Sequence, residues 1–109
     1  MITMINDISF MASLEKTRFT LAEIEKIKAE ADNGSPKAEF EYGVILLKGL
    51  GTKPNKEEAL KYFEKAKAHA SFDITRILSH YYDELHMEDE SLECRKNSLK
   101  DYQDSLGLF

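Results

Sequence analysis

The fold is decided by residues 38–70, AEFEYGVILLKGLGTKPNKEEALKYFEKAKAHA. Small residues recur in this stretch where two antiparallel helices would approach each other closely, and two glycines stand where the first helix should end. The close-approach positions are Ala38, Gly43, Ala59 and Ala66, with Phe63 on the same helix face as the last two, and the turn glycines are Gly49 and Gly51. The pattern predicts a tightly packed helix hairpin and carries no sign of an active site.

The same residues resemble the Sel1-like repeat, a helix hairpin of about thirty-six residues that is related to the tetratricopeptide repeat. The residues that match the family pattern in type and spacing are Ala38, Tyr42-Gly43, Gly49-Leu50-Gly51, Glu58-Ala59, Tyr62-Phe63 and Lys65-Ala66. The chain departs from the pattern at four places, with Thr52 for the usual Val, Asn55 for Asp, Lys67 for Ala and Ala70 for Gly. The resemblance implies a solenoid that binds other proteins and is not an enzyme.

Short capping signals predict five helices and a short sixth at the front of the chain. Thr20 and Glu23 form a capping box for a helix over about residues 21–32, which Gly34 ends. A serine before a proline, or a polar residue three positions before a glutamate, marks further helix starts. These signals are Ser35-Pro36, Asn55 with Glu58, and Ser71, and a last helix is expected from about Glu90 to near Gly107 with Leu92, Leu99, Tyr102 and Leu106 on its apolar face.

The expected fold class is all-α, a short right-handed superhelical array of antiparallel helix hairpins with about five to six helices. One domain covers residues 1–109, with a cap and half repeat in 1–34, a full repeat in 35–70, and a degenerate repeat with a cap in 71–109. Apolar residues near both ends are expected to cover the ends of the solenoid, or alternatively to form a dimer contact. They are Ile5, Ile8, Phe10, Met11, Leu14, Leu106, Leu108 and Phe109.

Length and composition agree with one modest core. A chain of 109 residues is too short for two cores, and charges interrupt its apolar stretches well before the length of a membrane span. No basic region precedes the weakly apolar N-terminus, so we expect a cytoplasmic protein that does not enter a membrane. Cys94 is alone and is expected to be an ordinary packing or surface thiol.

The net charge of −5 lies in the last third of the chain. Residues 1–72 carry eleven acidic and eleven basic side chains, whereas residues 73–109 carry nine acidic and four basic ones. Six acids follow one another without an intervening Lys or Arg, across the expected loop between the last two helices: Asp83, Glu84, Glu88, Asp89, Glu90 and Glu93. They fit either a solvated loop whose acids favour the start of the last helix or a docking surface for a basic partner. Their order does not match a calcium-binding EF-hand.

Other ligand classes fit the sequence poorly. The lysines are dispersed among glutamates, which disfavours direct nucleic-acid binding. Gly49-Leu50-Gly51 lacks the Gly-Lys-Ser/Thr element of a phosphate loop, and we expect no cofactor. His80 and Glu84 are one helical turn apart, but no second histidine follows at metal-binding spacing, while His69 and His86 fall near expected helix ends. We expect no metal site.

Three classes of function fit these observations. The first is a small immunity or inhibitor protein, a monomer or weak homodimer, that masks a basic toxin or enzyme with its acidic C-terminal surface. Tyr81 and Tyr82 would be aromatic anchors of that surface if either faces out, although their spacing favours the core. The second, which the resemblance also implies, is an adaptor or scaffold in bacterial signalling or secretion. The third is a small enzyme that uses the acidic cluster with His80 or His86.

Overall fold

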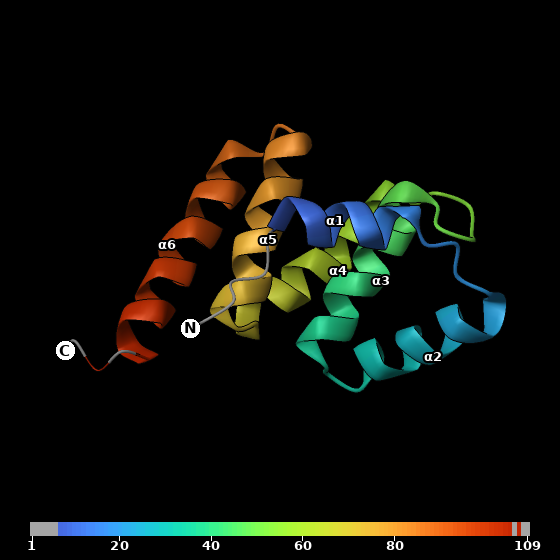
Figure 1. Ribbon diagram of the computed structural model, residues 1–109, viewed down its shortest axis with the longest axis horizontal. Helices are drawn as coiled ribbons and strands as arrows, with labels where there is room; N and C mark the ends of the chain where they lie inside the picture. The colour runs from blue at the N-terminus through green and yellow to red at the C-terminus, as the bar shows by residue number, and fades with distance from the viewer. Residues whose placement is uncertain (1–6, 106, 108–109) are drawn as a thin grey trace.

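The computed structural model of the chain describes residues 7–105 and 107, and of residues 7–10, 12, 72, 98 and 101–105 it describes the backbone alone. Within this part of the chain six α-helices follow one another (Figure 1): α1 (Asp7–Lys16), α2 (Leu21–Asp32), α3 (Pro36–Lys48), α4 (Lys56–His69), α5 (Phe72–Glu84) and α6 (Glu88–Ser105). The closest packing joins sequence neighbours, α3 with α4, α5 with α6, and α2 with α3. The predicted all-α array of sequential helix hairpins is therefore confirmed.

Local capping residues set three of the helix starts. The Thr20 hydroxyl accepts a hydrogen bond from the Glu23 N–H, and the Glu23 carboxylate accepts one from the Thr20 N–H. The Ser35 hydroxyl caps α3 before Pro36, and the Asn55 side chain caps α4. These contacts satisfy backbone donors that the first helical turn leaves free. The helix starts predicted at these three places are confirmed.

Two elements differ in detail from the expectation. Ser71 takes the N-cap position of α5, but its hydroxyl makes no capping hydrogen bond. The last helix starts at Glu88 and not at about Glu90. The Ser91 N–H already donates to the Met87 carbonyl, so the first helical turn forms directly after Met87.

The turn between α3 and α4 depends on its glycines. Gly49 ends α3 in the left-handed conformation with φ 67°. Gly51 has φ 101°, and a Cβ there would lie 2.2 Å from the Phe19 carbonyl oxygen. The backbone of the segment before α2 crosses the turn at this point, where the Phe19 N–H donates to the Leu50 carbonyl. Glycine is thus required by both conformation and space.

The first hairpin, formed by α3 and α4, is packed most closely at Gly43, where α3 has no side chain. A Cβ at Gly43 would lie 2.5 Å from Phe63 Cε1 and 3.3 Å from the Ala59 carbonyl oxygen. Ala59, Phe63 and Ala66 are fully buried on the facing side of α4, and Ala38 is 3% exposed on α3. The small residues therefore let the two helices pack with little space between their backbones.

An aromatic cluster connects this hairpin to the next one. The Phe63 ring centroid lies 6.4 Å from that of Phe40, 5.8 Å from that of Tyr81 and 6.0 Å from that of Tyr82. The rings come from α3, α4 and α5, and all four side chains are at most 1% exposed. Pairs at such distances stabilise a core beyond the area that they bury.

In the second hairpin, formed by α5 and α6, small polar and sulfur-containing residues lie where the two helices meet. The buried Ser91 hydroxyl donates to the Ser79 carbonyl, twelve residues earlier in the chain. In the first hairpin the facing pair, Gly43 and Ala59, is sixteen residues apart. The shorter turn between α5 and α6 therefore shifts the pairing by about one helical turn.

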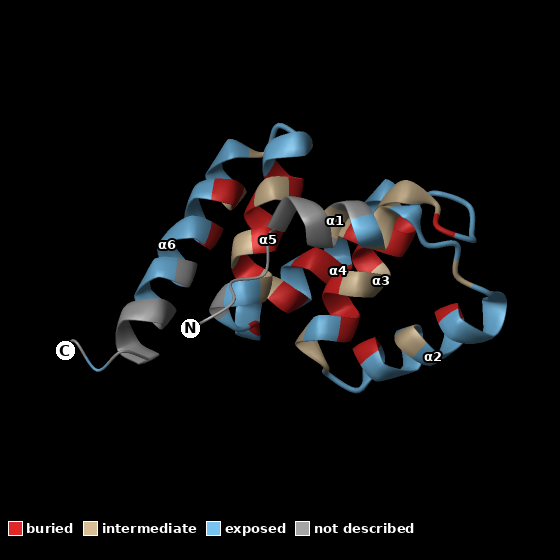
Figure 2. Cartoon of the chain, in the orientation of Figure 1, coloured by how far each residue is buried: buried red, intermediate tan, exposed pale blue. Residues whose placement is uncertain are grey.

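Small residues form the buried face of α6. Ser91 and Cys94 face α5, whereas Leu92 and Leu99 are 50% and 58% exposed. The apolar face expected for the last helix, with Leu92 and Leu99, is therefore not the face that packs against α5. Figure 2 shows α6 buried on the side toward α5 and exposed on the other.

Only two of the predicted end-cap side chains, Met11 and Leu14, are among the described residues. Met11 and Leu14 of α1 are half-buried and pack against the main core. The side chains of Ile8, Phe10 and Tyr102, and all of Ile5, Leu106, Leu108 and Phe109, lie outside the described residues. Their capping role stays a prediction.

Gly43→Ala should destabilise the protein. In an ordinary helix this change stabilises by about 0.5 to 1 kcal/mol, but here the new methyl group would overlap the buried Phe63 ring. We expect a loss of about 1 to 3 kcal/mol, seen as a lower melting temperature by circular dichroism.

A Phe63→Leu background tests the cause, because the smaller side chain removes the ring edge that the methyl group meets. Gly43→Ala should cost less there, whereas Lys53→Ala in the exposed turn should change neither melt. If Gly43→Ala raises the melting temperature of the parent protein, the close approach of α3 and α4 is wrong.

Cys94 should be almost unreactive in the folded protein. Its side chain is fully buried, and burial raises the pKa of the thiol from 9.0 to about 11. Since the thiolate is the reactive form, this leaves about one hundredth as much of it at pH 8. Titration with a thiol reagent at pH 8 should proceed at least about 100-fold more slowly than in guanidinium chloride. Equal rates in the two solutions would contradict the packing of Cys94 against α5.

Candidate functional site

Six acids surround the turn between α5 and α6, and we call them the acidic corner: Asp83, Glu84, Glu88, Asp89, Glu90 and Glu93. Two of them end α5, and four lie in the first two turns of α6. Between the helices His86 adopts the left-handed conformation, φ 59°, which usually requires glycine. The chain reverses sharply there, so acids from both helices lie at the same end of the hairpin (Figure 1).

The two acids of the corner that lie on α5 are neutralised by cations of the chain itself. Asp83 forms an ion pair with Arg95 of α6. Glu84 forms one with Lys48 of α3, whose ammonium also lies 3.3 Å from Glu15 Oε1 of α1. Burial lowers the pKa of Lys48, but its hydrogen bonds with the two carboxylates outweigh burial and raise the pKa above its usual value. Lys48 therefore stays charged and links three helices.

Lys67 of α4 neutralises the inner side of the corner. Its Nζ lies 2.6 Å from Glu90 Oε2, 3.5 Å from Glu93 Oε2 and 3.3 Å from Glu64 Oε1. Only 11% of the Lys67 side chain is exposed. Burial lowers the pKa of Lys67, but the hydrogen bonds that its ammonium donates to Glu90 and Glu64 raise the pKa more, so the net direction is upward.

Lys67 is the sequence feature that indicates this ion cluster. Lys67 stands where the repeat pattern has alanine, at a position that packs against the next hairpin. A cation at such a position is stable only with acidic partners, because burying an unpaired charge is costly. The departure from the pattern could have indicated that some of the six acids face inward.

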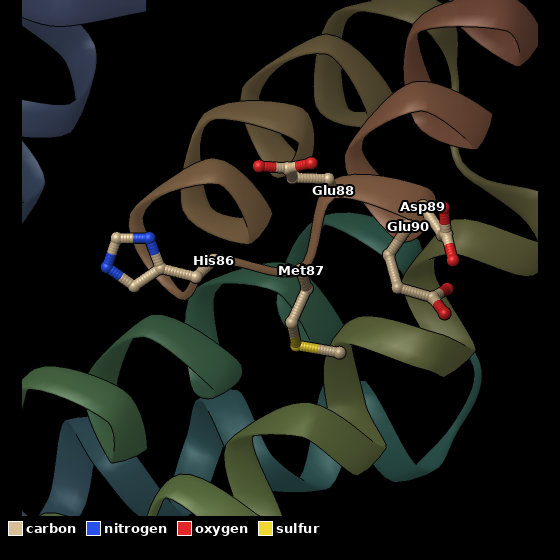
Figure 3. Close-up of a pocket in the computed structure, with 5 residues that line it drawn as sticks. All are labelled: His86, Met87, Glu88, Asp89 and Glu90. Atoms are coloured by element: carbon tan, nitrogen blue, oxygen red, sulfur yellow. The ribbon is translucent and has the colours of Figure 1, made fainter.

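Glu88 and Asp89 are the uncompensated part of the acidic corner. Both are exposed in the first turn of α6, and no described cation lies within ion-pair distance of either. With His86, Met87 and Glu90 they line an open hollow of about 370 Å³. In Figure 3 the Met87 side chain points toward the neighbouring helices, and the His86 ring points away from the acids. The helix dipole favours acids at this position, which explains why two of them are tolerated there.

Tyr81 and Tyr82 do not reach this surface, because both side chains are fully buried. Their expected role as aromatic anchors depended on one of them facing outward, and neither does. The Tyr82 hydroxyl donates to Glu64 Oε1 at 3.4 Å, whereas the buried Tyr81 hydroxyl has no hydrogen-bond partner among the described residues. Burial raises the pKa of both phenols, so both stay neutral. The two tyrosines are core residues below the corner.

Neither His69 nor His80 lies in a cluster of metal-binding side chains among the described residues. His69 Nε2 lies 2.9 Å from Glu39 Oε1, whose carboxylate is almost completely buried. Glu84, the possible fellow ligand of His80, binds Lys48 instead. Among the described residues no group of three or more His, Cys, Asp or Glu side chains is placed to hold a metal ion.

Comparison with known proteins identifies the central hairpin. The family model of the Sel1 repeat matches residues 36–71, which comprise α3, the glycine turn and α4. No curated protein and no solved structure matches the chain. No helix among the described residues combines the length and the apolar character that a bilayer crossing requires. Sel1 repeats are generally protein-interaction modules and usually non-catalytic scaffolds. The chain thus carries a Sel1 repeat, which spans residues 36–71.

Proposed function

We propose that the protein is a small cytoplasmic inhibitor or immunity protein that binds a basic toxin or enzyme through the acidic corner. The observation that carries this proposal is the exposed pair Glu88 and Asp89, which have no cation of the described chain beside them. A Sel1 repeat next to this surface supports the binding of a protein and not of a small substrate.

The ion pairs within the acidic corner indicate which acids are available to a basic partner. Asp83, Glu84 and Glu90 already have cations beside them, so a basic partner would have to displace or share these contacts. Glu88 and Asp89 offer charge without that competition. A lysine or arginine of the partner beside them would also have the hollow next to His86 and Met87 available for its side chain. Complementary charge of this kind mainly accelerates the encounter of two proteins.

An adaptor or scaffold role is the alternative, and it is favoured by the Sel1 repeat itself. The two roles differ in what binding does to the partner. An inhibitor should abolish the activity of its partner at a one-to-one ratio, whereas an adaptor should leave that activity intact while joining a second protein. Titrating the partner's activity with the purified chain separates the two roles.

The double variant Glu88→Lys with Asp89→Lys should bind its partner much more slowly. The partner is first obtained by a pull-down with the intact chain, followed by mass spectrometry. The rate of association between this partner and each chain, parent or variant, is then measured with the chain at about 1 µM, at low and at high salt. Because two exposed acids become cations, we expect the rate at low salt to fall about tenfold or more and its salt dependence to weaken or reverse.

Two control variants give this measurement its meaning. Glu25→Lys with Glu30→Lys on the exposed face of α2 makes the same change in net charge far from the corner along the chain, and should alter the rate only slightly. Glu90→Lys places a cation beside Lys67 and should lower the melting temperature, which marks the effect of damage to the fold. If the double variant binds as fast as the parent with the same salt slope, the acidic corner is not the binding surface.

A further inference from the structure

The outer face of α6 carries two exposed leucines with no described helix packed over them. Leu92 and Leu99 are seven residues apart, two helical turns, and therefore lie on the same side of the helix. This side is turned away from Ser91 and Cys94, which face α5. Exposed leucines aligned along a terminal helix indicate a contact surface more strongly than scattered ones do.

The charges that flank Leu92 are arranged in a self-complementary way. Glu88 and Asp89 lie four and three residues before it, and Arg95 and Lys96 lie three and four residues after it. All four side chains are exposed. Two such helices side by side in the same direction would place like charges together, whereas two in opposite directions would place acids against bases.

We propose that α6 pairs with α6 of a second copy of this chain, antiparallel, about a two-fold axis at Leu92. Helical geometry then places Glu88 beside Arg95 of the second copy on one flank, and Asp89 beside Lys96 of the second copy on the other. The two-fold axis repeats both pairs, and Leu92 meets Leu92 of the second copy at the centre. Leu99 extends the apolar strip on both sides.

The existing ion pair of Arg95 is compatible with this arrangement. Its guanidinium already contacts Asp83, but it has five N–H donors and more than half of the side chain is exposed. The leucine strip is short, far below the roughly 1,600 Å² that a stable interface buries. The dimer should therefore form at about 100 µM and dissociate at about 1 µM.

The pairing would cover the same two acids that the proposed function uses. It does not depend on that function, because the mass in solution is measured without a partner. Partner binding, in turn, is measured at about 1 µM, where the chain should be monomeric. Either proposal can therefore fail while the other stands.

The pairing is tested by reversing either the two acids before Leu92 or the two cations after it. One variant carries Glu88→Lys and Asp89→Lys, and the other carries Arg95→Glu and Lys96→Glu. Each alone should be monomeric at about 100 µM by sedimentation velocity, because all four contacts become repulsive. An equimolar mixture should form a dimer again, because all four contacts between unlike copies are then attractive. Addition of about 0.5 M salt should weaken both the parent dimer and the mixed dimer.

A smaller pair of variants guards against effects on folding. Asp89→Lys and Lys96→Glu leave the contact between Arg95 and Asp83 intact, and each should weaken association while their mixture restores it. A parent protein that stays monomeric at about 100 µM would overturn the proposal. So would a parent dimer that neither variant changes, or variants that associate no better together than alone.

Discussion

The close approach of the Phe63 ring to the backbone of α3, where Gly43 has no side chain, is the contact on which the rest of the structure depends. It brings α4 against α3 and positions the ring to contact Phe40, Tyr81 and Tyr82. Through these aromatic contacts the first hairpin also positions the second. A larger residue at Gly43 would therefore disturb more than one helix pair, because close-packed interiors transmit strain.

The hairpin of α3 and α4 and the hairpin of α5 and α6 differ in the length of their turns. Seven residues separate α3 from α4, but only three separate α5 from α6. The second hairpin closes at Ser79 and Ser91, and the leucines of α6 lie on its exposed side. The exposed side of α6 supplies the apolar strip proposed to join two copies.

Cations of the chain divide the six acids of the acidic corner into a paired and an unpaired group. Lys48 and Lys67 come from the Sel1 repeat and hold acids of α5 and α6, so they act as links between hairpins. Within the acidic corner, only Glu88 and Asp89 have no described cation beside them. The net charge of −5 therefore overstates the negative surface available to a partner. A basic partner and a second copy of the chain would compete for the same two side chains.

The sequence by itself determined the starts of α2, α3 and α4, the glycine turn and the identity of the Sel1 hairpin. Those features depend on residues a few positions apart, such as Thr20 with Glu23, and local hydrogen bonds decide them. Only the tertiary structure decided which acids are paired and which face of α6 is buried. Lys67 meets Glu90 twenty-three residues later in the chain, and such contacts depend on how whole helices pack. The register of a helix pair follows from turn length and packing together, and neither can be read from the apolar pattern of one helix.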